Sequence, residues 1–303
     1  MKMGISTSNY DIVFFEEYLR NKKRLSESSI DNYIAVIQRF FKEDRDINDV
    51  ASYNDFLIKY SIKKRATHYY SVLKSFIEFK FTAAADRNRL FEKLIVPPKK
   101  YDIKQERKHL PENKIIEIIN NLDSEKHRVV ALIQTLTGIR AGDVLRTPRK
   151  NIVSEEYQGT TVLRLNIIGK RRKRNVIFIH DKIGQQLVMK YLFSATGWED
   201  YPFLDGFQTR SLATTMDIET RIVKKNYLYY WRDLKEALSK ANIDKKDFAT
   251  HDFRRCFARR AWEKYKDIHV LMNLLNHKDP ATTIRYLTQS GLRNIDYLWE
   301  MQQ

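Results

Sequence analysis

The sequence predicts a mainly α-helical protein of two domains, with a small antiparallel β-sheet in the second domain. Three observations support this fold class. Apolar residues recur at intervals of three to four positions over most of the chain, which is typical of amphipathic helices. A charged stretch with paired prolines, IVPPKKYDIKQERKHL, has no apolar period and predicts a linker. Further on, between residues 160 and 180, the apolar positions alternate, which indicates strands.

Residues 1–95 are predicted to form a helical domain. Ile12, Phe15 and Leu19 lie three to four positions apart and therefore share one face of a first helix. Ser26 is a suitable N-cap for a second helix, because its hydroxyl can accept from the free amides of the first turn. The following stretches continue the helical pattern: LSESSIDNYIAVIQRFF, SYNDFLIKY and THYYSVLKSFIEF.

A basic loop precedes the last of these helices. Lys63, Lys64 and Arg65 come before a helix start that presents Thr67 and His68. Cations and free amides at a helix N-terminus favour phosphate, and a helix entered in this way can lie in the major groove of DNA. A solvated basic loop explains the same residues equally well. The sequence does not decide between these two interpretations, and the five residues are kept as candidates for DNA binding.

A linker is predicted at residues 96–110, and a second domain at residues 111–303. Helical patterns in this domain frame two alternating stretches rich in β-branched residues, TTVLRLNII and NVIFIH, which predict a hairpin. Its turn holds five cations: Lys170, Arg171, Arg172, Lys173 and Arg174. A run of cations is usually a solvated surface, but between two strands it can also be aimed at a DNA groove.

Helices are predicted again after the hairpin. One long helix is expected from Arg221 through Lys240, followed by one that contains HDFRR and another that contains DIHVLMNLLNH. Asp279 and Pro280 predict the start of the next helix, since Asp favours the N-cap and Pro the first helical position. A short amphipathic tail helix is expected around Trp299.

Charge and cysteine content limit the classes of function. The chain has 55 Lys and Arg against 38 Asp and Glu, a formal net charge of +17, which favours a polyanionic partner over a merely basic cytosolic protein. The single cysteine, Cys256, excludes an intramolecular disulfide framework and a cysteine-rich zinc site. No apolar run approaches the roughly 20 residues that cross a bilayer. The start MKMGISTSNY lacks the apolar core of a secretory signal, so we expect a soluble cytoplasmic protein without membrane association.

The stretch from His251 to Tyr286 gathers residue types that can attack a phosphodiester. His251 and Arg254 lie three positions apart and share a helical face, and His277 and Tyr286 follow within the same stretch. A tyrosine oxygen can act as a covalent nucleophile, and arginine matches phosphate oxygens with two parallel hydrogen bonds. Histidine can hold a proton or a hydrogen bond near neutral pH. Each residue alone also has an ordinary structural interpretation, so the hypothesis rests on the combination.

Taken in order, TGIR, GKRRKR, HDFRR, LLNHKDPATT and IRY resemble the signature of the tyrosine recombinases, the phage integrase family that includes Xer and Cre. Order and spacing agree over these five matches. The helical stretch before the linker also looks like the core-binding domain of the family. The resemblance therefore implies a two-domain architecture, with a helical core-binding domain followed by a mixed α/β catalytic domain. The catalytic residues that it implies are Arg140, Lys170, His251, Arg254, His277 and Tyr286.

Three positions modify what the resemblance implies. Asp143 stands where the family commonly has glutamate three residues after its first arginine, and we expect it to orient the active site. Asn276 replaces the glycine of the family's LLGH, which is expected to be tolerated if the backbone there is helical. Both Lys170 and Lys173 can be the lysine of the hairpin, and we favour Lys170.

The resemblance implies a site-specific recombinase or integrase that cuts and rejoins double-stranded DNA at a specific recombination site. It implies a 3′-phosphotyrosyl intermediate on Tyr286 and a homotetramer on DNA, without metal, cofactor or ATP. An accessory protein that sets the direction of the reaction is a further partner that the family allows. The expected location is the cytoplasm, associated with the nucleoid, or the host cytoplasm for a viral protein. The alternatives are a nicking-closing enzyme like a type IB topoisomerase, and a DNA-binding regulator that does not cut.

Overall fold

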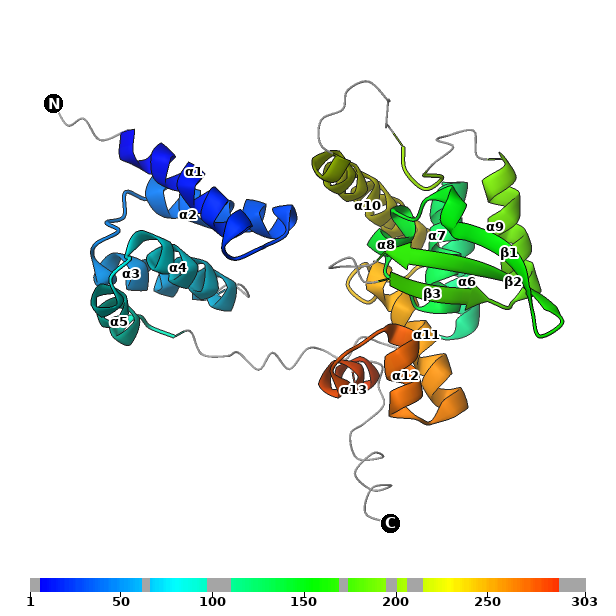
Figure 1. The fold of residues 1–303 in the computed structure, drawn as a ribbon. Helices are drawn as coiled ribbons and strands as arrows, with labels where there is room; N and C mark the ends of the chain where they lie inside the picture. The colour runs from blue at the N-terminus through cyan, green and yellow to red at the C-terminus, as the bar shows by residue number, and fades with distance from the viewer. Residues whose placement is uncertain are drawn as a thin grey trace, which may run out of the picture. The chain divides into compact units, whose positions relative to one another are not determined.

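The structure is a computed structural model, and it describes residues 6–61, 66–96, 110–168, 174–194, 201–205 and 215–288 (Figure 1). The chain divides into two compact units, unit 1 over Met1–Ile103 and unit 2 over Lys104–Gln303. The regular structure of the described residues is helical except for one three-stranded antiparallel sheet in unit 2. The predicted fold class is therefore confirmed. None of the described helices combines the length and apolar character that crossing a membrane requires.

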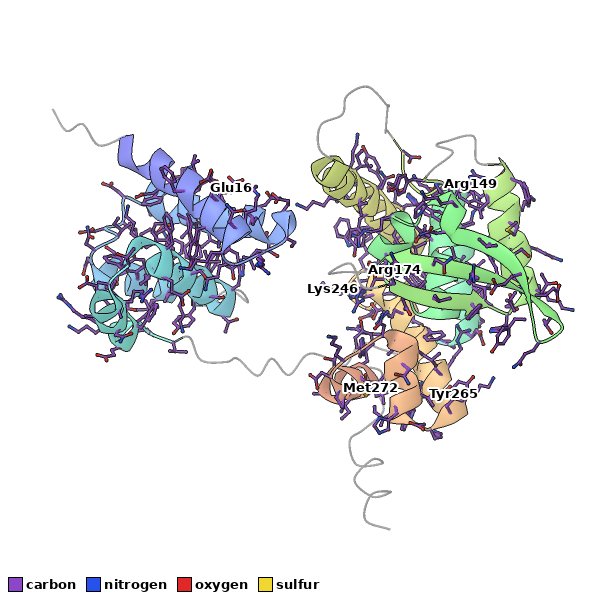
Figure 2. The ribbon with its side chains drawn as sticks, in the orientation of Figure 1. Glu16, Arg149, Arg174, Lys246, Tyr265 and Met272 are labelled. Carbon is purple, nitrogen blue, oxygen red and sulfur yellow. The ribbon has the colours of Figure 1, made fainter. Side chains whose placement is uncertain are left out.

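The described part of unit 1 is built from helices around an aromatic core. Its elements are α1 (Ser6–Asn21), α2 (Glu27–Lys42), α3 (Val50–Ser61), α4 (Ala66–Lys80) and α5 (Ala84–Lys93). Phe15 of α1 is fully buried and meets the ring of Phe76 from α4 edge-on, with centroids 5.1 Å apart. Phe40 of α2 meets Phe56 of α3 in the same way, at 5.3 Å. Figure 2 shows the side chains of unit 1 filling the space enclosed by its helices.

The helices predicted for unit 1 are present, with one addition. Ser26 is the N-cap of α2, as predicted, with extended backbone angles of φ −71° and ψ 150°, but its hydroxyl faces that of Ser29 at 3.0 Å and caps no amide. The sequence pattern does not predict α5, because Leu90 is the single buried residue of that helix and one apolar position defines no period.

Unit 2 contains the sheet and the remaining described helices. Before and within the sheet come α6 (Glu112–Asn120), α7 (Glu125–Thr137), α8 (Ala141–Leu145), the single 3₁₀ turn η1 (Arg149–Asn151), β1 (Ile152–Tyr157), β2 (Thr160–Ile168) and β3 (Arg174–Ile179). After the sheet come α9 (Lys182–Ser194), α10 (Thr215–Lys240), α11 (Thr250–Tyr265), α12 (Ile268–Leu275) and α13 (Pro280–Thr288). The long helix α10 begins at Thr215, earlier than the predicted start at Arg221.

The sheet has the strand order β1-β2-β3, and both pairs are antiparallel. The predicted hairpin is confirmed as β2 and β3, while β1 is an edge strand that the pattern does not predict. Leu165 in the middle of β2 faces Ile152 on one side and Ile177 on the other. The turn from β1 to β2 has positive φ at both Gln158 (49°) and Gly159 (72°), the geometry of a tight two-residue hairpin. Helices α7 and α9 contact this sheet (Figure 1).

A buried glutamine of α7 connects three parts of unit 2. Gln134 is completely buried, and its Oε1 accepts a hydrogen bond of 2.9 Å from the hydroxyl of Tyr230 in α10. Its Nε2 donates to the carbonyl oxygens of Ile139 (3.3 Å) and Thr250 (3.2 Å). These carbonyls lie directly beside Arg140 and His251 in the sequence, so Gln134 fixes the backbone next to two of the predicted site residues.

A second polar connection closes the start of α7. The carboxylate of Asp233 in α10 accepts from the amides of Asp123 (2.9 Å) and Ser124 (3.2 Å), and it lies 2.6 Å from Nδ1 of the buried His127. Burial raises the pKa of the Asp233 carboxyl, but the bonds from His127 and the two amides lower it more, so the net shift is downward. The ionised form therefore stabilises the fold.

We predict that Asp233→Asn lowers the free energy of unfolding by about 1–3 kcal/mol at neutral pH, because a charged acceptor for three donors is lost. A carboxyl group with a lowered pKa stabilises the fold above its ordinary pKa and loses that effect as the pH falls through the folded value. The difference between variant and wild type should therefore shrink in strong acid. Urea unfolding at neutral and acid pH measures both effects. Glu236→Gln, on the exposed face of the same helix, is the control and should change little.

Candidate active site

A pocket of about 530 Å³ lies in unit 2 where the end of α7, the strands β2 and β3, and the turn from α12 to α13 meet. Four residues of the predicted active site line it: Arg140, Asp143, Arg254 and His277. They come from segments more than a hundred residues apart in the chain, so the fold brings them together.

The turn after α7 places Arg140 at the pocket. The helix ends at Gly138, whose left-handed backbone (φ 70°, ψ 12°) reverses the chain, and its amide donates to the carbonyl of Gln134 at 2.8 Å. Arg140 then acts as N-cap of α8, with its side chain 43% exposed. A Cβ on residue 138 would lie 2.3 Å from Cδ1 of Phe257, so the ring of α11 also requires glycine here. The TGIR stretch thus delivers a half-exposed guanidinium.

The buried carboxylate of Asp143 lies beside this guanidinium. Its Oδ2 is 3.8 Å from Nη1 of Arg140, and its Oδ1 accepts a 2.9 Å hydrogen bond from Nη1 of Arg146. Burial raises the pKa of Asp143, and the positive charges of Arg146, Arg140 and Arg254 offset part of that shift. The geometry suits the predicted role of orienting Arg140, and it adds Arg146 as a second cation held by the same carboxylate.

Arg254 is the buried cation of the site, with 3% of its surface exposed. Its Nη1 donates to the carbonyl oxygen of Gly138, and its Nη2 donates to the carbonyl oxygen of Leu275 at 2.7 Å and faces Nε2 of His277 at 3.0 Å. Burial lowers the pKa of Arg254 to about 10, and the charge of Arg140 contributes to the lowering. The group remains a cation at neutral pH, but its charge is only partly compensated.

The contacts of His277 define its tautomer. A guanidinium can only donate, so Nε2 of His277 must accept from Arg254 and the proton must be on Nδ1. Nδ1 lies 2.9 Å from Oγ1 of Thr283, which then accepts this proton. Burial, and then the charges of Arg254 and Arg140, lower the pKa of His277 to about 4. The imidazole is therefore neutral near pH 7 and faces the arginine with a lone pair.

Asn276, the residue before this histidine, does not have the expected backbone. It was expected to be tolerated in place of glycine because of a helical backbone, but it is the left-handed C-cap of α12, with φ 50° and ψ 46°. The expected helical backbone is therefore wrong. Asparagine fits here because it is one of the few side chains that adopt the left-handed conformation at low energy.

His251 lies in the first turn of α11 and keeps an exposed surface. The buried part of its ring, followed by the charges of Arg254 and Arg140, lowers its pKa, so the imidazole is neutral and can accept a proton near neutral pH. The preceding residue, Thr250, is anchored by a 2.6 Å hydrogen bond between its hydroxyl and that of Tyr227. This contact, together with the bond from Gln134, fixes the start of α11.

Tyr286 lies on α13 next to two of these groups. Its ring centroid is 5.2 Å from that of His277 and 5.7 Å from Cζ of Arg254. The helix starts at Pro280, as predicted, and the carboxylate of Asp279 accepts from the amide of Ala281 at 3.0 Å. The predicted nucleophile is therefore placed beside the pocket by its own chain.

Other predicted residues stand apart from this cluster. Lys170, Arg171, Arg172 and Lys173 lie outside the described residues, as do Lys63, Lys64 and Arg65. In unit 1, Thr67 is exposed in the first turn of α4, and His68 packs edge-on against the ring of Tyr33, with centroids 5.7 Å apart. The DNA-binding predictions for these residues stay predictions.

Sequence reasoning missed three residues of the pocket region. Asn175 and Lys278 line the pocket, and Thr283 holds His277. Lys278 follows a predicted site residue directly, and Asn175 lies in the predicted hairpin, so their sequence positions could have indicated that they lie near the site. Thr283 gave none, because a threonine within a helix is common. In the described part of the chain, no group of three or more His, Cys, Asp or Glu side chains is arranged to hold a metal ion.

In chemical terms, two guanidiniums, two neutral imidazoles and a phenol form a site that can bind an oxyanion beside an oxygen nucleophile. The Phage integrase family matches residues 108–291 of this chain. Since this is more than half of the sequence, the chain belongs to the phage integrase family, the tyrosine recombinases, which are DNA breaking and rejoining enzymes. The resemblance seen in the sequence is thereby confirmed.

Individual relatives agree with this assignment. Tyrosine recombinase XerD of Rickettsia bellii (strain RML369-C) is 23% identical over 299 residues, which cover 94% of this chain and 88% of the relative. The structure is similar to that of XerH recombinase bound to difH substrate, with a TM-score of 0.61, 16% identity, and coverage of 96% of this chain and 84% of that chain. A lambda integrase dimer bound to a COC′ core site gives a TM-score of 0.59, 14% identity, and coverage of 92% and 76%. These structures share the fold.

We predict that Gly138→Ala destabilises unit 2 by more than the roughly 1–2 kcal/mol of a left-handed alanine, because the new methyl group also displaces the ring of Phe257. Gly142→Ala is the matched control, since its Cβ would meet Arg146 at an ordinary 3.7 Å within α8. Alanine in a helix should be neutral or stabilising there, by about 0.5–1 kcal/mol. Thermal and urea unfolding compare the two variants, and equal stability of both would contradict this account of the turn.

Proposed function

We propose that this protein is a site-specific DNA recombinase or integrase that cleaves and rejoins DNA through a covalent bond to Tyr286. The observation that carries the proposal is the convergence of Arg140 and Arg254 at one pocket, with the ring of Tyr286 next to Arg254 and His277. The side chain of Tyr286 also hydrogen-bonds Arg254, which supports a phenol oxygen close to a phosphate bound by that guanidinium. No specific observation favours the two alternatives, a nicking-closing enzyme or a DNA-binding regulator that does not cut.

The proposed reaction exchanges one phosphodiester for another. The Tyr286 oxygen attacks the scissile phosphorus, the bond from phosphorus to the 5′-oxygen breaks, and a 3′-phosphotyrosyl enzyme and a free 5′-hydroxyl result. The phenol proton passes to His251, whose lowered pKa makes it a neutral acceptor. Lys170 supplies the proton to the departing 5′-oxygen. Attack by a 5′-hydroxyl reverses these steps, so the bond energy is retained and no ATP is needed.

The arginines supply the electrostatic stabilisation in this proposal. Negative charge spreads over the non-bridging oxygens in the transition state, and two fixed guanidiniums oppose it. Each is worth on the order of 3 kcal/mol, as fixed donors to an oxyanion are. Because Arg140 and Arg254 provide the positive charge, the proposed mechanism has no step that requires a metal ion or another cofactor. Asp143 orients Arg140. A bound phosphate raises the pKa of His277, so that the ring takes up a proton on Nε2 and donates it to a non-bridging oxygen in place of its contact to Arg254.

We also propose how the domains share the work. Residues 1–95 are the core-binding domain, 96–110 the basic linker and 111–303 the catalytic domain. Double-stranded DNA containing a specific site is the substrate, and most contacts go to its phosphates. The DNA-binding candidates are Lys63, Lys64, Arg65, Thr67, His68, Arg171, Arg172 and Lys173. The net charge of +17 supports a polyanionic partner of this kind.

Assembly on DNA is part of the proposal. Strand exchange between two duplexes needs four active sites, so we propose a homotetramer on DNA. A lambda integrase tetramer bound to a Holliday junction has the same fold as this chain, with a TM-score of 0.57. The predicted tail helix around Trp299, which lies outside the described residues, is a candidate link between neighbouring protomers. We further propose that an accessory protein sets the direction of the reaction and that the protein is located with the DNA of the nucleoid.

A nicked suicide substrate tests the proposed nucleophile. The nick lets the cleaved strand diffuse away, so the wild-type protein should remain covalently attached to DNA, and peptide mapping should find the adduct on Tyr286. Tyr286→Phe should bind the same DNA and form no adduct, because the attacking oxygen is missing. Denaturing gels count the adduct and filter binding measures affinity. Equal trapping by both proteins would reject Tyr286 as the nucleophile.

DNA affinity should fall steeply with salt. Each phosphate neutralised by Lys or Arg releases counterions, so the logarithm of the binding constant should fall linearly with the logarithm of the salt concentration, by about 0.9 per phosphate contacted. Fluorescence anisotropy with a labelled duplex over a salt series measures the slope. A flat response from low to physiological salt would contradict DNA binding through phosphate contacts.

A further inference from the structure

Thr283 is a buried residue of the nucleophile helix with an unexplained polar contact. Its side chain in α13 is completely buried, and its Oγ1 lies 2.9 Å from Nδ1 of His277. On the other side of the same imidazole, Nε2 lies 3.0 Å from Nη2 of Arg254. A continuous row of hydrogen bonds therefore runs from α13 through His277 to the buried guanidinium.

The direction of these hydrogen bonds follows from Arg254. With Arg254 donating to Nε2, the neutral ring carries its proton on Nδ1, and the threonine oxygen accepts it. The opposite tautomer would point an N–H group at the guanidinium. A doubly protonated ring would do the same and add a second positive charge at 3.0 Å. Thr283 is thus the acceptor that the one compatible tautomer needs.

The position of Thr283 in the sequence links this contact to the nucleophile. Thr283 and Tyr286 are three residues apart on α13, so their side chains project from the same face of the helix. Tyr286 places its ring 5.2 Å from that of His277, against the same imidazole that Thr283 holds. If α13 moves away from the site, it removes both the phenol and the acceptor for His277.

We propose that Thr283 is a positioning residue: its hydroxyl fixes the ring of His277 so that Nε2 holds the guanidinium of Arg254, which makes the docking of α13 and the alignment of Arg254 a single event. This inference rests on the proposed function of the site. The phosphate-binding arginine is then fully aligned only in a protomer whose own Tyr286 is docked. A protomer with α13 undocked would bind DNA and cleave it poorly.

Removal of the hydroxyl has a defined consequence. Thr283→Val keeps the size and β-branching of the side chain and leaves Nδ1–H without an acceptor in a buried place. The ring then changes its tautomer or rotates, and its contact to Arg254 is lost. Burial, the larger cause of the lowered pKa of His277, remains in this variant, and the contribution of the Arg254 charge should become smaller. Thr283→Ser restores the acceptor and should restore the wild-type behaviour.

The experiment combines NMR with cleavage. Histidine labelled with ¹⁵N reports the tautomer of each of the seven histidines, and His277→Asn assigns the signal of His277. We expect wild type and Thr283→Ser to show the Nδ1–H tautomer at neutral pH, and Thr283→Val to lose it. Thr283→Val should also trap the suicide substrate about tenfold more slowly or worse, by analogy with metal-ligating histidines, where loss of the hydrogen-bond partner costs about 10–100-fold.

A matched control separates positioning from packing. Thr135 in α7 is also buried, and its hydroxyl bonds only within its helix, to the carbonyl of Ala131 at 2.8 Å. Thr135→Val removes a buried hydroxyl from the same unit without touching His277, so its tautomer signal and cleavage rate should match wild type. Circular dichroism verifies that each variant is folded.

The outcomes decide the inference separately from the proposed function. An Nε2–H tautomer in the wild-type protein would overturn the inference even if Thr283→Val does not fold. An unchanged tautomer in folded Thr283→Val, or a changed tautomer with wild-type cleavage, would overturn it as well. A wild-type protein that forms no covalent adduct would instead reject the proposed function, and the tautomer would still report on the contact.

Discussion

The structure of the site depends on one buried guanidinium. Arg254 is 3% exposed, and its hydrogen bonds go to the carbonyls of Gly138 and Leu275 and to the side chains of His277 and Tyr286 rather than to a carboxylate. These carbonyls close α7 and α12, where helix dipoles concentrate partial negative charge. Two helix ends thus stabilise a cation that burial would otherwise make costly. Because partial charges compensate a full charge incompletely, as the lowered pKa near 10 indicates, the site keeps a strong preference for an anion.

The same cation sets the protonation of its neighbours. Burial and the charges of Arg254 and Arg140 lower the pKa of both His251 and His277, so the two imidazoles are neutral near pH 7. A neutral His251 can accept a proton from a phenol, whereas an imidazolium could not. A neutral His277 offers a lone pair to Arg254. The negative charge of a bound phosphate would raise the pKa of this imidazole and favour its protonated form. The two arginines of the proposed phosphate site therefore also keep both imidazoles neutral.

The sequence predicted the elements whose side chains repeat a pattern, and it missed those defined by backbone or edge position. Helix α13 was predicted from Asp279 and Pro280, because a cap and a first-turn proline are local signals. Strand β1 was not, since it is an edge strand in which Ile152 is buried and most other residues face solvent, so alternation is absent. The order and spacing of Arg140, Arg254, His277 and Tyr286 led to the proposed site. The contact between Thr283 and His277 could not be predicted from the sequence, because it depends on which face of α13 meets His277.

The two left-handed residues of the site show why a family pattern is kept at one position and altered at another. Gly138 and Asn276 both end helices whose last carbonyls point at Arg254, so each chain reversal supplies part of the cation's environment. At residue 138 the ring of Phe257 occupies the place of a Cβ, so glycine is required for space as well as for φ. Asn276 lines the open pocket, where a side chain has room, and only the backbone angle restricts the choice. Asparagine meets that restriction, and so the departure from glycine leaves the carbonyl of Leu275 aimed at Arg254.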